Sequence, residues 1–270
     1  MLRFVDLARG NLNGPITAIC VVVALLSLPL GANASSKPSV SELAAITARG
    51  RVLAEYDKAA WYATDAVMAL HLKIGSSDRY ISHKAVAGWV VDFGRLNATG
   101  DKFLVLHEAV QKISLAQFEV KNFDPAREDT GWNLAAAKGI ETATKDFGRT
   151  DRPYNVAVLP VEQGIYLYPA QIEAGVYLLG RDVRYRVAPD GTRVLEKRQM
   201  HKSIIETAPA SSMDSVAGGY HIHVLSELPE DTDVLFVLTR RPHVPEIVIA
   251  GPYMYTIDPH GTITAADRLK

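Results

Sequence analysis

Two histidines separated by a single residue, His221 and His223, are the strongest chemical signal in the sequence. Side chains two positions apart in a β-strand lie on the same face, so both imidazoles would reach one point. Asp233 follows where the next element should begin, and its carboxylate could complete the site. Three protein ligands and one water form the open tetrahedral arrangement of hydrolytic zinc centres. The spacing therefore predicts a zinc site at these three residues, and zinc there would activate a water molecule.

A simpler interpretation of the same segment stays open. A His-x-His pair also occurs in ordinary strands, where the imidazoles contact solvent or form hydrogen bonds without a metal. Asp231, Thr232 and Asp233 are residue types that favour the first turn or cap of a helix. His201 lies apart from the segment and could either join the site or face solvent, and we expect it to face solvent.

The segment around the histidine pair resembles the JAB/MPN metalloprotease family. The motif of that family is an upstream Glu, then His-x-His, ten residues and Asp, with Ser three positions before the Asp. Here nine residues separate His223 from Asp233, and Glu230 stands in place of the Ser. The resemblance covers roughly residues 130–265 and implies that His221, His223 and Asp233 bind zinc, with Asp231 as the substitute for Asp233.

The resemblance also implies a glutamate that acts as the general base of a peptidase or isopeptidase. Glu173 and Glu162 both stand near the start of a predicted strand, as the glutamate does in the family. If the strand that begins at Asn155 is the counterpart instead, the general base is missing. The alternative is then a catalytically inactive JAB-like module that binds or scaffolds other molecules.

The first 34 residues have the three-part layout of a cleavable secretory signal. Arg3 and Arg9 precede an apolar run over residues 16–30, and Ala32-Asn33-Ala34 supplies the small residues recognised at the cleavage site. We therefore expect a periplasmic or secreted protein whose substrate, if it is an enzyme, is an envelope peptide or protein.

Composition limits the chemistry of the mature chain. The only cysteine lies in the predicted signal, so a metal site must use histidines and carboxylates. The formal net charge of −1 gives no electrostatic footprint for nucleic acid. No other stretch is long and apolar enough for a membrane span. Nothing in the sequence indicates an oligomeric state.

Periodicity predicts an α+β fold in two parts. Ser39 and Glu42 are spaced as a capping box for a helix over about 40–71. This helix and an antiparallel meander form a unit over 39–122, and charged residues 122–128 mark its boundary. A mixed-sheet JAB-like α/β domain over 130–265 follows. It is expected to contain a helix over 131–147 capped by Thr130, several strands, and a strand or short helix over 231–239 capped by Thr232 or Asp233. The three tryptophans are expected in the core: Trp61, Trp89 and Trp132.

Overall fold

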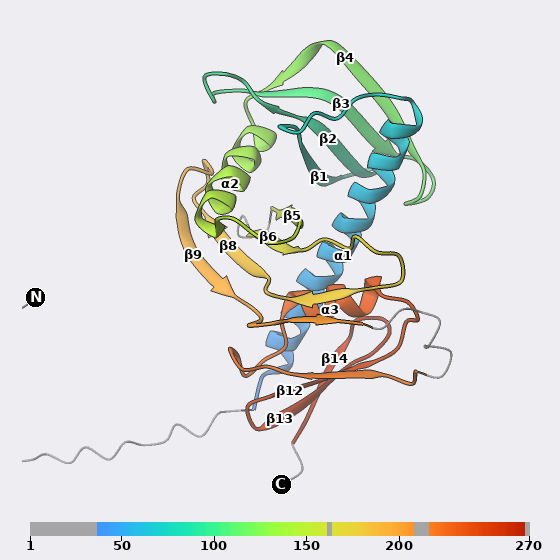
Figure 1. Cartoon of the computed structure of the whole chain (residues 1–270), viewed down its shortest axis with the longest axis vertical. Helices are drawn as coiled ribbons and strands as arrows, with labels where there is room; N and C mark the ends of the chain where they lie inside the picture. Colours follow the sequence, from blue (N-terminus) through green and yellow to red (C-terminus); the bar gives the residue numbers. More distant parts are fainter. Residues whose placement is uncertain (1–36, 161–163, 208–215, 268–270) are drawn as a thin grey trace, which may run out of the picture. The chain divides into compact units, whose positions relative to one another are not determined.

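The structure is a computed structural model that describes residues 37–160, 164–207 and 216–267 (Figure 1). Two of the expectations from sequence lie outside these residues, namely the secretory signal over 1–34 and the candidate general base Glu162. The described chain contains three α-helices and four sheets, so the predicted α+β class is confirmed.

The longest helix, α1 (Val40–Ala69), begins at the predicted capping box. The backbone N–H of Ser39 donates to the Glu42 carboxylate at 2.8 Å, and the N–H of Glu42 donates to the Ser39 hydroxyl at 3.2 Å. Gly50 in the middle of α1 faces the short helix α3 (Asp231–Thr239), where an added Cβ would lie 2.4 Å from the Cβ of Val234. The glycine therefore lowers helix propensity but allows the two helices to pack in close contact.

An antiparallel sheet follows α1 in chain order (Figure 1). Its strands are β1 (Arg79–Ala85), β2 (Gly88–Leu96), β3 (Phe103–Gln111) and β4 (Phe118–Asp129). Strand β4 was not predicted, and it runs through the charged residues 122–128. It is an edge strand without a fully buried residue: Phe118 and Val120 are partly buried and alternate with exposed residues, but this alternation stops at the charged segment over 122–128. Charged side chains join it to β3 instead, as in the contact of Arg127 with Glu108 at 2.8 Å.

Helix α2 (Trp132–Phe147) covers a second antiparallel sheet. Its N-cap is Gly131, so the predicted cap at Thr130 is wrong, whereas the helix ends at Phe147 as predicted, with Gly148 as its C-cap. The sheet has the order β5 (Tyr154–Leu159), β6 (Gly164–Pro169), β8 (Val183–Val187) and β9 (Val194–Gln199). In the sequence, the short strand β7 (Leu178–Gly180) lies between β6 and β8, and it pairs with β10 (Ile204–Glu206).

The last sheet is mixed, as predicted for this part of the chain. Strand β11 (Gly219–Ile222) runs parallel to β12 (Glu246–Ala250), while β13 (Tyr253–Ile257) and β14 (Ile263–Asp267) continue the sheet in antiparallel order. Helix α3 is the crossover between the two parallel strands. Residues just beyond the carboxyl end of β11 and in the first turn of α3 therefore belong to one loop region, where parallel α/β units commonly form sites.

Three apolar clusters hold these elements together. One of them joins Leu43 and Ile46 of α1 to Val234 and Val237 of α3 and to the inner face of the last sheet. The first helix thus packs against both the meander and the elements that follow residue 130. Among the described helices, none has the length and apolar character needed to cross a membrane.

The three tryptophans differ in burial. Trp89 is 4% exposed and belongs to the first apolar cluster, and Trp132 packs partly buried against the second. Trp61 is 59% exposed, so its predicted place in the core is wrong. Periodicity along a long helix identifies its apolar stripe but does not show which neighbouring positions the other elements leave uncovered.

Candidate metal centre

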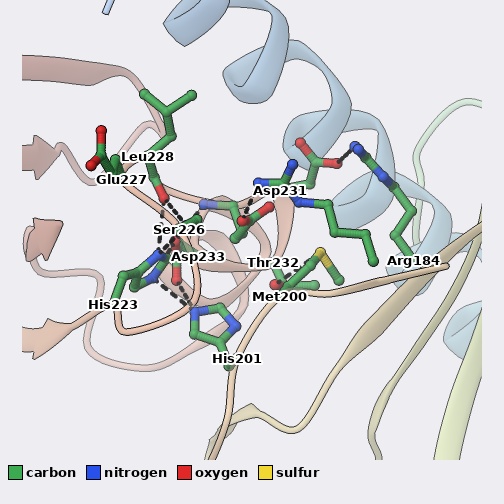
Figure 2. A network of polar contacts seen from close by, with 12 residues as sticks. Arg184, Met200, His201, His223, Ser226, Glu227, Leu228, Asp231, Thr232 and Asp233 are labelled. Carbon is green, nitrogen blue, oxygen red and sulfur yellow. Dashed lines mark hydrogen bonds and ion pairs between the residues drawn. The ribbon is translucent and has the colours of Figure 1, made fainter. Parts of the chain in front are cut away.

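Three histidines and one aspartate converge at the N-terminal end of α3, and the aspartate belongs to the first turn of that helix. The nitrogens of His201, His221 and His223 and a carboxylate oxygen of Asp233 all lie within 4.8 Å of one another, so together they could hold a metal ion. All four side chains are buried. Figure 2 shows His201 and His223 pointing toward each other beside Asp233. The predicted convergence of His221, His223 and Asp233 is therefore found, with His201 as an additional member.

The distances between the donor atoms fit a metal site. Nε2 of His223 lies 2.9 Å from Nε2 of His201 and 3.1 Å from Nε2 of His221. Oδ1 of Asp233 lies 3.0 Å from Nε2 of His201 and 3.1 Å from Nε2 of His221. Four ligand atoms at 2.0–2.1 Å from a tetrahedral ion are about 3.3 Å apart, which is close to these separations.

Two of the imidazoles are held from behind by carboxylates. Nδ1 of His201 lies 2.8 Å from Oδ1 of Asp182, and Nδ1 of His221 lies 2.8 Å from Oε1 of Glu246. Arg240 donates to the other Glu246 oxygen at 2.6 Å and fixes that carboxylate in turn. Hydrogen bonds of this kind orient metal-binding histidines and increase their basicity.

The third imidazole is held by the backbone. Nδ1 of His223 lies 2.9 Å from the carbonyl oxygen of Leu228 and 3.1 Å from the hydroxyl of Ser226. That hydroxyl itself donates to the same carbonyl oxygen. A carbonyl oxygen only accepts, as an ionised carboxylate does, so Nδ1 carries the proton in each ring. When the rings are neutral, the three Nε2 lone pairs face one another, which is unfavourable unless a metal ion or added protons supply positive charge between them.

Asp233 combines a role in helix capping with a position in the cluster. Its Oδ2 accepts the backbone N–H of Glu230 at 2.7 Å in a capping box, while its Oδ1 faces His201 and His221. The N-cap of α3 is Glu230, so the expected caps at Thr232 and Asp233 are wrong. The capping interaction fixes one oxygen of Asp233 and so aims the other at the imidazoles.

The charges around the cluster favour a cation. Asp182, Glu246 and Asp233 are buried carboxylates, and Arg240 is the buried guanidinium paired with Glu246. With neutral imidazoles, this group carries two uncompensated negative charges, which matches a divalent ion.

The pKa shifts of the clustered side chains arise from the same buried charges. Burial opposes charge on His201, but Asp233 and Asp182 outweigh it and raise the pKa of His201 to about 11. Asp233 and Glu246 likewise raise the pKa of His221 to about 9 against the effect of burial. Burial acts to raise the pKa of Asp233, yet His201 and His223 hold it well below its ordinary value.

Backbone packing positions the imidazole of His221 against its carboxylate. Gly219 begins β11, and an added Cβ there would lie 2.2 Å from Oε2 of Glu246. A side chain at this position would displace the Glu246 carboxylate, and β11 pairs His221 with Val248, two residues beyond Glu246. The parallel pairing of the two strands thus brings Glu246 of β12 behind the imidazole of His221 of β11.

Two expectations about this region are wrong. His201 was expected to face solvent, but it is only 7% exposed and lies in the cluster. Asp231, the proposed substitute ligand, instead forms ion pairs with Arg49 at 3.0 Å and Arg184 at 2.9 Å and accepts the Tyr166 hydroxyl at 2.8 Å. Two guanidinium groups occupy the carboxylate of Asp231, so it belongs to a separate network beside the cluster.

Glu173, one of the two candidate general bases, does not join the cluster. Glu173 lies exposed on the turn before β7 and is absent from the group of converging side chains. Glu162 lies outside the residues that the structure describes. Asp182 and Glu246 support the imidazoles but were not singled out from the sequence, because each lies in a segment distant from its histidine.

Comparisons with known proteins leave the resemblance to the JAB/MPN family resting on the sequence pattern alone. No family model matches the chain, and no curated protein or solved structure is found to be similar to it.

Proposed function

We propose that the chain is an exported zinc-binding protein, with His201, His221, His223 and Asp233 as the ligands. The observation that carries this proposal is the set of acceptors behind the three Nδ1 atoms, since they turn three Nε2 lone pairs toward one carboxylate. A zinc ion would neutralise the excess negative charge and separate the lone pairs.

Zinc fits this donor set better than magnesium or calcium does. Magnesium and calcium prefer shells made of oxygen ligands, whereas imidazole nitrogens dominate here. Three nitrogens and one oxygen, at separations close to the edges of a tetrahedron, match the coordination that zinc adopts in proteins.

The best-supported role of this zinc is to stabilise a JAB-like binding or scaffold module of the periplasm. Four protein ligands complete a tetrahedral shell, which is the arrangement of structural zinc sites. The ligands come from the segment between β9 and β10, from β11 and its end, and from α3, so the ion would tie three parts of the chain together. The loss of the serine of the family motif, replaced by Glu230, also argues for a non-catalytic role.

A zinc-dependent peptidase or isopeptidase of JAB type, acting on an envelope peptide or protein, is the second candidate. The favouring observation is that the three residues of the family motif lie together in the cluster, while His201 is additional to that motif and could move aside. His221, His223 and Asp233 would then leave one coordination position for the substrate or water. Glu162 or Glu173 would have to act as the base.

The two candidates are separated by measuring stability and hydrolysis on the same zinc-loaded protein. A stabilising module should gain melting temperature on zinc binding and leave a library of labelled peptides and isopeptides uncut. A hydrolase should cleave part of the library, and Glu162→Gln or Glu173→Gln should abolish that cleavage while zinc binding is retained. A protein that takes up no zinc contradicts both candidates.

A further inference from the structure

A hollow lies beside α1, and Asp57 and Trp61 of that helix line every part of it. Three cavities of about 140, 240 and 440 Å³ are all lined by Asp57 and Trp61, so they are parts of one hollow, called here the Asp57 hollow. A cavity of about 150 Å³ suffices to bind a molecule the size of benzene. None of the four proposed zinc ligands lines it, so it is a separate site.

The carboxylate of Asp57 forms no ion pair among the described residues, and the adjacent Lys58 acts on it only from a distance. Tyr168 donates its hydroxyl to Oδ1 at 2.7 Å, and the side-chain amide of Asn155 approaches the same oxygen at 3.5 Å. Neither contact brings a positive charge, and burial raises the pKa of Asp57 above its ordinary value. A half-buried carboxylate in such a place is stabilised by a cation that enters from outside.

Trp61 provides an exposed aromatic wall. Its side chain is 59% exposed, and its indole N–H donates to Asp65 one turn further along α1 at 3.0 Å. The hydrogen bond restrains the ring at the rim of the hollow instead of leaving it free in solvent. Indole faces attract ammonium groups, and tryptophan does so more strongly than the other aromatic side chains.

In two of the three cavities, every charged residue of the lining is acidic. The smallest cavity adds Asp182 to Asp57, the second adds Asp65, and neither is lined by a lysine or arginine. Oδ2 of Asp182 is also buried without a hydrogen-bond partner among the described residues. The basic residues Lys58 and Arg241 line only the largest cavity.

We propose that the Asp57 hollow binds a primary ammonium group, which pairs with the Asp57 carboxylate and rests against Trp61. Such a group is carried by a lysine side chain of a peptide or by a free alkylamine, and both sources share the chemistry that this hollow recognises. The proposal does not depend on zinc. It gives the protein a ligand class that the metal centre alone does not suggest.

Calorimetric titration of the full chain tests the proposal with three probes. These are acetyl-Ala-Lys-Ala-amide, cadaverine, and acetyl-Ala-norleucine-Ala-amide, which lacks the charge. We expect saturable binding of the lysine peptide, of cadaverine, or of both, and none of the norleucine peptide. Binding of the lysine peptide alone identifies a peptide as the source, and binding of cadaverine alone identifies a free amine.

Three variants show where the ammonium group binds. Asp57→Asn should weaken binding about tenfold or more, because it removes a charge-assisted contact. Trp61→Leu, at an exposed position that the fold does not need, should weaken it about two- to fivefold. Glu141→Gln removes one exposed negative charge on α2 and should leave binding unchanged.

The proposal is overturned if neither cationic probe binds, if the norleucine peptide binds equally well, or if Asp57→Asn and Trp61→Leu both bind like the wild type. Repeating the titration after zinc has been removed by a chelator keeps this test apart from the metal proposal. Unchanged ammonium binding in a protein that takes up no zinc would support the hollow and contradict the zinc centre.

Discussion

Replacing His201 with alanine should weaken zinc binding strongly while the fold persists. The substitution removes one of four donors, whose Nε2 lies 2.9 Å from that of His223 and 3.0 Å from Oδ1 of Asp233. His221, His223 and Asp233 remain and can still hold zinc more weakly. Changes to partners that only orient metal ligands lower affinity about 10–100-fold, so the loss of a ligand itself should lower it at least about 100-fold.

The expected change in the free energy of unfolding follows from this hundredfold loss of zinc affinity. When free zinc exceeds both dissociation constants, a hundredfold loss of affinity lowers the zinc-dependent stabilisation by about 2.7 kcal/mol. For a chain of this size, about 2–4 °C of melting temperature accompanies each kcal/mol, so the zinc-induced rise should shrink by about 5–11 °C.

Thermal unfolding at chelator-buffered zinc concentrations measures this change, and a competition titration measures the affinity directly. His260→Ala is the matched control, because that imidazole is exposed and lies outside the cluster. An His201→Ala protein with the zinc affinity and zinc-induced stabilisation of the wild type would refute the assignment of His201 as a ligand.

Three further predictions concern the support of the centre, its protonation and the helix packing. Glu246→Gln should lower zinc affinity about 10–100-fold in competition titrations, because the amide holds His221 less strongly than the carboxylate does, and an unchanged affinity would count against this role. In the metal-free protein, the pKa of His221 is raised to about 9 and that of His201 to about 11. Protonation of these two histidines therefore stabilises the fold. This contribution is complete below pH 6.5 and is lost as the pH rises through the two raised pKa values. The melting temperature in chelator should therefore fall more steeply with rising pH for the wild type than for His221→Ala, and equal slopes would contradict the prediction. Gly50→Ala should destabilise the protein by about 1–3 kcal/mol in urea unfolding, because the added Cβ meets Val234 at 2.4 Å, whereas a stabilised variant would show that α1 and α3 do not pack as described.

Local spacing made half of the centre predictable. His221 and His223 are two positions apart in and just after one strand, and Asp233 lies at the start of the helix that follows, so a short stretch of sequence contains all three. His201 lies 22 residues before His223 on a connecting segment, where no periodicity indicates which way a side chain points. Its partner Asp182 directly precedes β8, and the Glu246 behind His221 lies in β12, so only the folded topology brings these carboxylates to the histidines.

The same distinction applies to the fold. The capping box at Ser39 and Glu42 predicted the start of α1, because capping depends on residues three positions apart. Strand β4 was missed because it lies at a sheet edge and buries no side chain fully, and because its second half has the charged composition of a loop. The exposure of Trp61 also depends on which elements pack beside α1, and this information is absent from the helix itself.

The most direct test of the zinc centre is a crystal structure of the zinc-loaded protein with anomalous diffraction recorded at the zinc absorption edge. The account predicts one strong anomalous peak among Nε2 of His201, His221 and His223 and a carboxylate oxygen of Asp233, about 2.0–2.2 Å from each of the four atoms. The absence of a peak there, with the four side chains still in contact, would contradict it.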